Sequence, residues 1–310
     1  AFFEKLFGGL DKLYVIHHRV GVIGFSLLAV HPIILAFRYV SDSLEDAAAF
    51  LSPIGNTMPI TFGIASLLLM LALLFLTFYG SIFSYEKLKI AHQFLGLGFF
   101  LGFMHILFIP SSLNSDVVLK VSLVVTGVVG LLAFSYRTLL GKWLVSKYQY
   151  KVTGVKDLGG QMIEISMQAN PNRKKLYHLP GQFGMLSFPR VSFLPKEEHP
   201  FTISSAGVDG SLRFSIKALG DYTKTVALIG EGVDATIEGP FGEFSYLYGT
   251  TKQVWVAGGI GVTPFVSMAE YMLTQESIPY TIDFFYSSRS EADGVYKELF
   301  DAVMHKHPSF

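Results

Sequence analysis

The sequence predicts a membrane protein in two parts, an α-helical bundle followed by a soluble region of α/β or β-barrel type. Of the 310 residues, 51% are hydrophobic and only 15% are charged, whereas soluble domains average about 25% charged residues. Long apolar spans fill the first part. Short alternating stretches, such as LRFSIKA at 212–218, and glycine-rich turns fill the second. The composition changes near residue 140, which separates the two parts.

Four membrane helices are predicted, at residues 13–37, 59–83, 90–109 and 117–136, since about 20 apolar residues cross a bilayer. Basic residues flank the start of the first span, separate the second from the third and follow the fourth. The opposite loops carry acidic residues and no Lys or Arg. By the positive-inside rule, the first and third spans run in the same direction. We therefore expect an integral plasma-membrane protein, embedded in lipid, with its C-terminal part in the cytoplasm.

Composition also excludes several classes of function. The net charge is zero, which gives no indication of nucleic-acid binding. The chain has no cysteine, which excludes disulfides, thiolate-ligated haem and iron–sulfur clusters in this stretch. Histidine is therefore the main remaining ligand for a metal.

Two of the predicted spans carry a histidine near each end. His17 and His31 lie 14 residues apart, a rotation of about −40° and a rise of about 21 Å, so both imidazoles point the same way at two depths. His92 and His105 lie 13 residues apart, about −140° on an ideal helix, and would not share a face. The parallel spans nevertheless pair His17 with His92 and His31 with His105 by depth. Ionisable groups inside a membrane usually mark function, and each pair could hold one haem iron from both sides.

Other interpretations of these histidines stay open. A single histidine in an apolar helix is commonly a packing residue, and His18 could replace His17 as a ligand. A different class of function is a membrane proton path or sensor with a tethered reductase domain. Arg38, at the outer end of the first span, is either an interfacial anchor or a partner for an anion such as a haem propionate.

The motifs resemble those of the ferric reductase and NADPH oxidase superfamily. Residues 17–21, HHRVG, are similar to the family's HRxLG pattern, and residues 92–96, HQFLG, repeat it. The glycine lies four residues after the histidine in both, which favours His17 over His18. The resemblance implies two b-type haems, with iron ligands at His17, His31, His92 and His105. Family members usually have six spans, so it also implies that two spans precede this chain.

The second part resembles the same superfamily more specifically, with four motifs in family order. HPFT at 199–202, with ISS at 203–205, is similar to the flavin motif, and KALGDYT at 217–223 to the segment near the flavin pyrophosphate. GPFG at 239–242 is similar to the turn that closes the flavin domain. VWVAGGIGVTPF at 254–265 is similar to the strand, glycine turn and helix start that hold a nicotinamide dinucleotide.

These motifs imply the cofactor contacts residue by residue. The residues expected at FAD are His199, Pro200, Phe201, Thr202, Ser204, Ser205, Lys217, Gly220, Tyr222 and Thr223. Those expected at the dinucleotide are Gly258, Gly259, Gly261, Thr263, Pro264 and, for the 2′-phosphate of NADPH, Arg289. His199 is expected to support the flavin loop rather than to act as an acid or base, and we single out no catalytic residue. His178, His305 and His307 lie in polar stretches and are expected to be solvated.

The resemblance implies three domains. Residues 1–140 would form the transmembrane haem-binding domain, 141–249 an antiparallel FAD-binding β-barrel, and 250–310 an α/β NAD(P)H-binding lobe, the last two being similar to ferredoxin–NADP reductases. The family's last motifs have no match before Phe310, so this lobe is expected to be incomplete.

The expected function is that of a bacterial-type transmembrane NAD(P)H oxidase. Electrons from cytoplasmic NADPH, with NADH as an alternative, would pass through FAD and the two haems to an acceptor on the opposite side. We favour dioxygen, giving superoxide, over ferric chelates.

Overall fold

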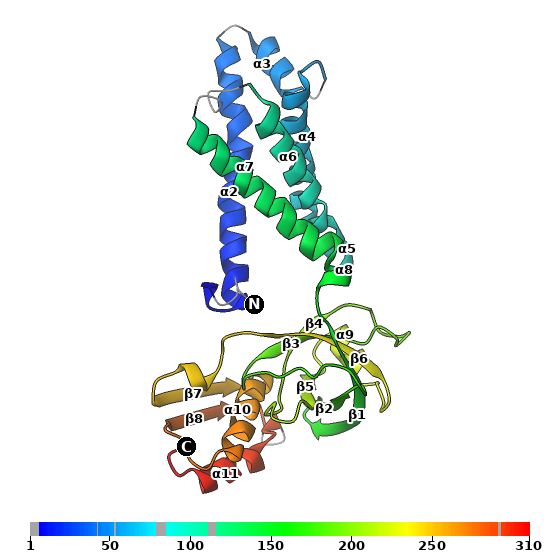
Figure 1. Ribbon diagram of the computed structural model, residues 1–310, viewed down its shortest axis with the longest axis vertical. Coiled ribbons are helices and arrows are strands. Elements are labelled where there is room, and N and C mark those ends of the chain that lie inside the picture. Colours follow the sequence, from blue (N-terminus) through cyan, green and yellow to red (C-terminus); the bar gives the residue numbers. More distant parts are fainter. Residues whose placement is uncertain (1–5, 42, 53, 79–84, 111–115, 291–292) are drawn as a thin grey trace. The chain divides into compact units, whose positions relative to one another are not determined.

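The computed structural model describes residues 6–41, 43–52, 54–78, 85–110, 116–290 and 293–310. The chain divides into two compact units, which are coloured along the sequence in Figure 1. His17–Val145 form a helical unit, and Ala1–Ile16 with Ser146–Phe310 form a unit that contains the sheets.

The helical unit consists mainly of long apolar helices. Its elements are α2 (Leu10–Val40) from His17 onward, α3 (Leu44–Leu51), α4 (Met58–Phe78), α5 (Tyr85–Gln93), α6 (Leu95–Phe108), α7 (Val117–Phe134), the π-helical turn η3 (Ser135–Leu139) and α8 (Gly141–Leu144). Within the described ranges, four segments are long and apolar enough to cross a membrane: Leu10–Val40, Met58–Leu76, Lys87–Phe108 and Val117–Leu139. They match the four predicted spans, although residues 79–83 of the second lie outside the described residues.

The third span is two helices rather than one. Phe94 separates α5 from α6, its N–H donating to Ala91 O at 3.0 Å while its carbonyl accepts from Leu97 N–H at 3.0 Å. These i→i+3 bonds are those of a 3₁₀ turn, which rotates by about 120° per residue rather than about 100°. The break therefore changes the angle between His92 and His105, and the value for an ideal helix does not apply.

Small residues allow α4, α6 and α7 to approach closely. A Cβ added at Gly127 of α7 would lie 2.3 Å from the ring of Phe103 on α6. Ser66 of α4 donates a buried 2.7 Å hydrogen bond to Gly98 O of α6. Close contacts at small residues and interhelical hydrogen bonds are what join helices in a membrane. These three helices therefore contact one another directly.

The second unit begins with a six-stranded antiparallel sheet in the order β4-β3-β6-β1-β2-β5. Its strands are β1 (Tyr148–Gly159), β2 (Met162–Ala169), β3 (Phe183–Ser187), β4 (His199–Thr202), β5 (Leu212–Lys217) and β6 (Asp234–Phe241). An Ile203–Phe214 bridge joins the two outer strands, β4 and β5, and Ser204 N–H donates to Arg213 O at 2.8 Å. This bridge closes the sheet around a fully buried core, as the predicted antiparallel barrel requires.

The nucleotide lobe is a βαβ unit. Strand β7 (Lys252–Gly258) runs parallel to β8 (Thr281–Ser287), and the crossover contains the 3₁₀ turn η5 (Gly259–Val262) and α10 (Thr263–Thr274). Parallel strands need such a crossover. Helix α11 (Lys297–Lys306) follows β8, and two short elements, α9 (Asp221–Val226) and η4 (Tyr246–Tyr248), precede β7. Aromatic side chains, among them Trp255, Phe284 and Phe310, form the core of the lobe.

Two of the three histidines expected to be solvated are not. His307 is 4% exposed, and its Nε2 lies 3.0 Å from Met272 O, so that expectation was wrong for His307. His178 is half-buried, with Nδ1 3.0 Å from Leu179 O. His305 is exposed. A polar stretch predicts exposure only on average, because one side chain of a surface helix or loop can still turn inward.

The contact between α6 and α7 gives a prediction. Gly127→Leu places a side chain where the ring of Phe103 lies, and such overpacking costs about 1–3 kcal/mol. We expect a lower midpoint of thermal unfolding for the purified protein in detergent. Val125→Leu, on an exposed position of the same helix, should leave the midpoint unchanged. Equal midpoints for the two variants would show that the α6–α7 contact is wrong.

Candidate functional site

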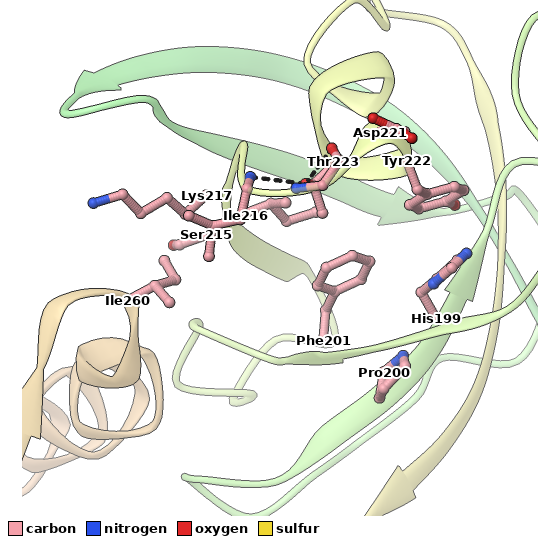
Figure 2. A pocket seen from close by; sticks show the side chains of 12 residues that line it. His199, Pro200, Phe201, Ser215, Ile216, Lys217, Asp221, Tyr222, Thr223 and Ile260 are labelled. Atoms are coloured by element: carbon pink, nitrogen blue, oxygen red, sulfur yellow. Dashed lines mark hydrogen bonds between the residues drawn. The ribbon is translucent and has the colours of Figure 1, made fainter. Parts of the chain in front are cut away.

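The barrel carries a pocket of about 390 Å³, within the range of about 300–1,000 Å³ typical of small-molecule sites. Figure 2 shows that β4, β5 and the turn leading into α9 surround it, while Ile260 enters from the nucleotide lobe. The lining residues are His199, Pro200, Phe201, Ser215, Ile216, Lys217, Leu219, Gly220, Asp221, Tyr222, Thr223 and Ile260.

All the predicted flavin residues line this pocket except Thr202, Ser204 and Ser205. Thr202 pairs with Phe183 in the ladder between β3 and β4. Ser204 is fully buried, and Ser205 Oγ accepts a 3.2 Å hydrogen bond from Arg213 N–H. The two serines therefore serve the hydrogen bonding inside the unit.

One threonine shapes the turn below the pocket. The backbone N–H groups of Leu219 and Gly220 donate to Thr223 Oγ1 at 3.0 and 2.9 Å, two bonds that Figure 2 marks near α9. The hydroxyl returns a 3.0 Å bond to Gly220 O. These three bonds hold the turn that carries Tyr222 to the pocket.

A histidine and a tyrosine stack on the side of the pocket. The ring centroids of His199 and Tyr222 lie 3.7 Å apart at an interplanar angle of 28°, and His199 Nε2 lies 3.0 Å from Glu197 Oε2. Burial, and secondly the charge of Glu197, raise the pKa of Tyr222 to about 12. The hydroxyl of Tyr222 therefore stays protonated at neutral pH and can donate.

The Tyr222 hydroxyl supplies a test of whether FAD fits. It is buried and has no hydrogen-bond partner among the described residues. Buried polar groups nearly always have a partner, so this donor indicates that a polar ligand atom belongs in the pocket. A flavin, which combines an apolar ring system with carbonyl and hydroxyl groups, fits these residues.

The glycine turn after β7 leaves room for a second ligand. A Cβ at Gly258, Gly259 or Gly261 would meet nothing within 4 Å, and Gly259 has a φ of +50°. The glycine turn leads directly into the N-terminus of α10, and Pro264 lies in the first turn of that helix. Thr263 is buried, and its hydroxyl donates to Ile260 O at 3.1 Å. Open space before a helix N-terminus suits the pyrophosphate of a dinucleotide.

The segment after β8 lies beside this turn. Gly258 is paired with Ser287 in the parallel ladder, so Arg289 follows at the carboxyl edge, where α/β lobes bind ligands. Arg289 is exposed. Lys217, which also lines the pocket, pairs with Asp293 at 3.2 Å. Its expected place at the flavin pyrophosphate stays a prediction. Hydrogen bonds from Ser290 and Lys217 lower the pKa of Asp293.

In the helical unit, two of the predicted ligands lie close together. The ring centroids of His17 and His92 lie 6.1 Å apart, with an interplanar angle of 76°. Metal–imidazole bonds of about 2.0–2.1 Å would place two axial rings at roughly this separation. This separation is compatible with one iron between the two rings.

The other predicted pair is His31 and His105, and the structure describes the surroundings of each of them separately. His105 Nδ1 lies 2.8 Å from Pro59 O of α4, and because a carbonyl only accepts, Nδ1 carries the proton. That leaves the lone pair on Nε2, as in histidines that bind metal. His31 is exposed on α2, where Ala36 is the only buried residue. The pairing of His31 with His105 stays a prediction.

A metal bound by protein groups alone has no site in the part of the chain that the structure describes. No cluster of three or more His, Cys, Asp or Glu side chains there is arranged to hold an ion. A haem iron takes four bonds from its porphyrin and needs only two from the protein, so paired histidines are the arrangement that fits it.

A pocket in a closed barrel that fits a flavin, a nucleotide lobe with a glycine turn and helices long enough to cross a membrane are the parts expected of a membrane reductase. Three family models match successive parts of the chain. "Ferric reductase like transmembrane component" matches residues 1–103, "FAD-binding domain" residues 147–245 and "Oxidoreductase NAD-binding domain" residues 255–310. Together these matches bear out the predicted fold class and support the predicted superfamily of ferric reductases and NADPH oxidases, and with it an NAD(P)H oxidoreductase.

Known relatives match only parts of the chain, and the chain in turn spans only a small part of each of them. NADPH oxidase 1 of Mus musculus is 36% identical over 94 residues, covering 28% of this chain and 16% of that protein. A superoxide-generating NADPH oxidase heavy chain of Dictyostelium discoideum is 30% identical over 139 residues, covering 39% and 26%. A similar solved structure is the ferredoxin reductase in carbazole 1,9a-dioxygenase, at 22% identity and a TM-score of 0.44, covering 52% of this chain and 48% of that one.

Sequence reasoning missed a group of polar residues between the barrel and the nucleotide lobe. Arg213 forms an ion pair with Glu270 of α10 and lies 3.6 Å from Glu164 of β2. The Tyr296 hydroxyl donates to Glu164 at 2.9 Å. No motif marks these residues, and the only available signal was the alternation along β5.

The pocket gives a prediction about FAD affinity. Tyr222→Phe removes the unpartnered hydroxyl, and since one hydrogen bond is worth about 0.5–1.5 kcal/mol, we expect FAD to bind about 2- to 10-fold more weakly. Because the pKa of Tyr222 is raised to about 12, its contribution should be constant from about pH 6 to about pH 9. Flavin fluorescence titration of the FAD-depleted protein measures both. Tyr248→Phe, at an exposed tyrosine outside the pocket lining, is the control, and equal affinities would contradict the assignment.

Proposed function

We propose that this protein carries electrons from cytoplasmic NADPH across the plasma membrane, through FAD and two bis-histidine b-type haems, to dioxygen on the opposite side, which becomes superoxide. One observation carries the proposal: the ring centroids of His17 and His92 lie 6.1 Å apart. These imidazoles belong to a chain that also contains FAD-binding and NAD-binding domains.

In the reductase half, the flavin pocket binds FAD and the glycine turn binds the nicotinamide dinucleotide. Bound FAD supplies the conversion from two-electron hydride chemistry to the one-electron chemistry of haem. Tyr222 donates to a polar atom of the flavin, and Phe201 supplies apolar contact. The turn at Gly258–Gly261 and the N-terminus of α10 hold the dinucleotide pyrophosphate. Arg289 pairs with the 2′-phosphate, and NADH binds the same site without that contact.

The four histidines hold the two irons. His17 is the ligand rather than His18, supported by its ring contact with His92. His31 and His105 hold the second iron, with Pro59 O fixing the tautomer of His105. With two histidines holding each iron, the acceptor would be reduced without binding the metal.

Charge supports the direction of transfer. Basic residues gather at the ends of the spans next to the reductase half, and acidic residues lie in the opposite loops. This distribution supports a cytoplasmic NADPH-binding module and reduction of the acceptor outside.

Dioxygen is favoured as the acceptor because the Dictyostelium relative is named as superoxide-generating. Ferric chelates are the second candidate, favoured by the name of the transmembrane family model. The rate of superoxide formation by purified full-length protein, compared with its rate of ferric chelate reduction, separates the two.

Histidine variants test the membrane path. We expect the purified full-length protein to show a Soret band whose reduced form appears on anaerobic addition of NADPH. His31→Ala or His105→Ala should remove the absorbance of one haem and abolish acceptor reduction, while NADPH still reduces the flavin. His18→Ala should retain both haems. Acceptor reduction that survives the loss of His31 or His105 would refute the path, and a protein without any Soret band would favour the proton path or sensor.

A second prediction concerns the choice between NADPH and NADH. Charge-assisted hydrogen bonds contribute about 1.5–3 kcal/mol, so Arg289→Ala should raise KM for NADPH by about 10- to 100-fold and leave KM for NADH nearly unchanged. Lys297→Ala, at an exposed lysine on α11, should change neither value. Steady-state kinetics with both nucleotides would contradict the role of Arg289 if the two KM values rose together.

A further inference from the structure

One face of β5 forms the boundary between the barrel and the nucleotide lobe. Side chains along a strand alternate between its two faces, so residues 213, 215 and 217 point to the same side. Each of them contacts the nucleotide lobe. The three contacts are Arg213 with Glu270, Ser215 with Tyr296 and Lys217 with Asp293. We call this row the β5 seam.

The middle contact of the β5 seam is the most enclosed. The Tyr296 hydroxyl donates to Glu164 Oε2 at 2.9 Å and lies 2.5 Å from Ser215 Oγ. Ser215 is 4% exposed, and burial raises the pKa of Tyr296, so the phenol remains a neutral donor. The two flanking ion pairs involve partly exposed side chains, where solvent and salt weaken the attraction.

The backbone of Tyr296 is held in an unusual conformation. It is a non-glycine residue in the left-handed region, with φ +70° and ψ 14°, immediately before α11. Such a conformation is unfavourable for a residue other than glycine and persists only where the surroundings hold it. Here the tyrosine side chain reaches out of the nucleotide lobe and into the barrel, bonding to β2 and β5.

The β5 seam runs along the wall of the flavin pocket. Ser215 and Lys217 line the pocket from β5, and Ile260 lines it from the glycine turn of the nucleotide lobe, as Figure 2 shows. Any change in the spacing across the seam therefore changes the distance between the glycine turn and the pocket. Hydride transfer requires reacting atoms about 3–3.5 Å apart, and displacements of about 1 Å slow a reaction steeply.

We propose that Tyr296 is a positioning residue for hydride transfer: its hydroxyl, bonded to Glu164 and Ser215, sets the spacing between the nucleotide lobe and the flavin pocket. This inference rests on the proposed transfer from NADPH to FAD. In that step the C4–H bond of the nicotinamide breaks and the hydride, with both electrons, passes to FAD. NADPH becomes NADP⁺, and FAD is reduced by two electrons.

The test is Tyr296→Phe in the full-length protein, which removes the hydroxyl and keeps the ring. At saturating NADPH without oxygen, we expect the rate of flavin bleaching to fall about tenfold. The FAD content and the dissociation constant for NADPH should stay within about twofold. NADPH deuterated at the transferred position should give a larger isotope effect than in the wild type, a change that loss of stability alone would not cause.

Tyr150→Phe is the matched control. Tyr150 is fully buried, and its hydroxyl makes two 2.9 Å hydrogen bonds, to Gly210 O and from Leu176 N–H, both inside the barrel. This variant loses as many bonds as Tyr296→Phe without touching the β5 seam. Its flavin bleaching rate at saturating NADPH should therefore match the wild type.

A pair of variants at the partner residue keeps the test decisive if Tyr296→Phe folds poorly. Glu164→Gln retains an acceptor for Tyr296 and should bleach at close to the wild-type rate, whereas Glu164→Ala should reproduce the slow rate. The inference is overturned if the hydroxyl-deleted and control variants bleach alike, or if only NADPH affinity changes. Normal flavin reduction without haem reduction in the wild type would instead overturn the proposed membrane path and leave this inference standing.

Discussion

In the proposed function, the membrane half depends on the contact between the imidazoles of His17 and His92. Helices α4, α6 and α7 interlock through small residues and a buried serine bond, but α2 buries only Ala36 among its 31 residues. Lipid offers no hydrophobic force to bring an apolar helix to its neighbours. In the proposed function, iron held between His17 and His92 provides that force, so haem binding and the docking of α2 are one event.

In the reductase half, the two faces of a single strand, β5, make different contacts. The inward residues of β5, Leu212, Phe214 and Ile216, are buried in the barrel core. The outward residues of the same strand form the β5 seam with the nucleotide lobe. The period of two in a strand thus lets one short segment hold the barrel together, line the flavin pocket and receive the second lobe. A displacement of β5 changes all three at once.

Hydrogen bonds hold one wall of the pocket, and a buried hydroxyl in the pocket has no hydrogen-bond partner among the described residues. The Thr223 hydroxyl fixes the turn, and His199 stacks on Tyr222 while pairing with Glu197. Burial leaves the Tyr222 hydroxyl protonated and without a partner among the described residues. A buried donor of this kind is unfavourable until a ligand accepts from it, so the geometry of the pocket prepares it for binding.

Local pattern was enough to predict the four spans, the barrel and its flavin pocket, because apolar length, strand alternation and motifs such as HPFT are properties of neighbouring residues. It was not enough for the angle between His92 and His105, which the break at Phe94 changes, or for the ion pair between Lys217 and Asp293. Tyr296 and Glu164 are 132 residues apart, and no short-range signal joins them. The sequence by itself determined which elements form and which cofactor domains they build. Only the tertiary structure decided which polar side chains meet between those elements, because such contacts depend on how whole strands and helices are brought together in space.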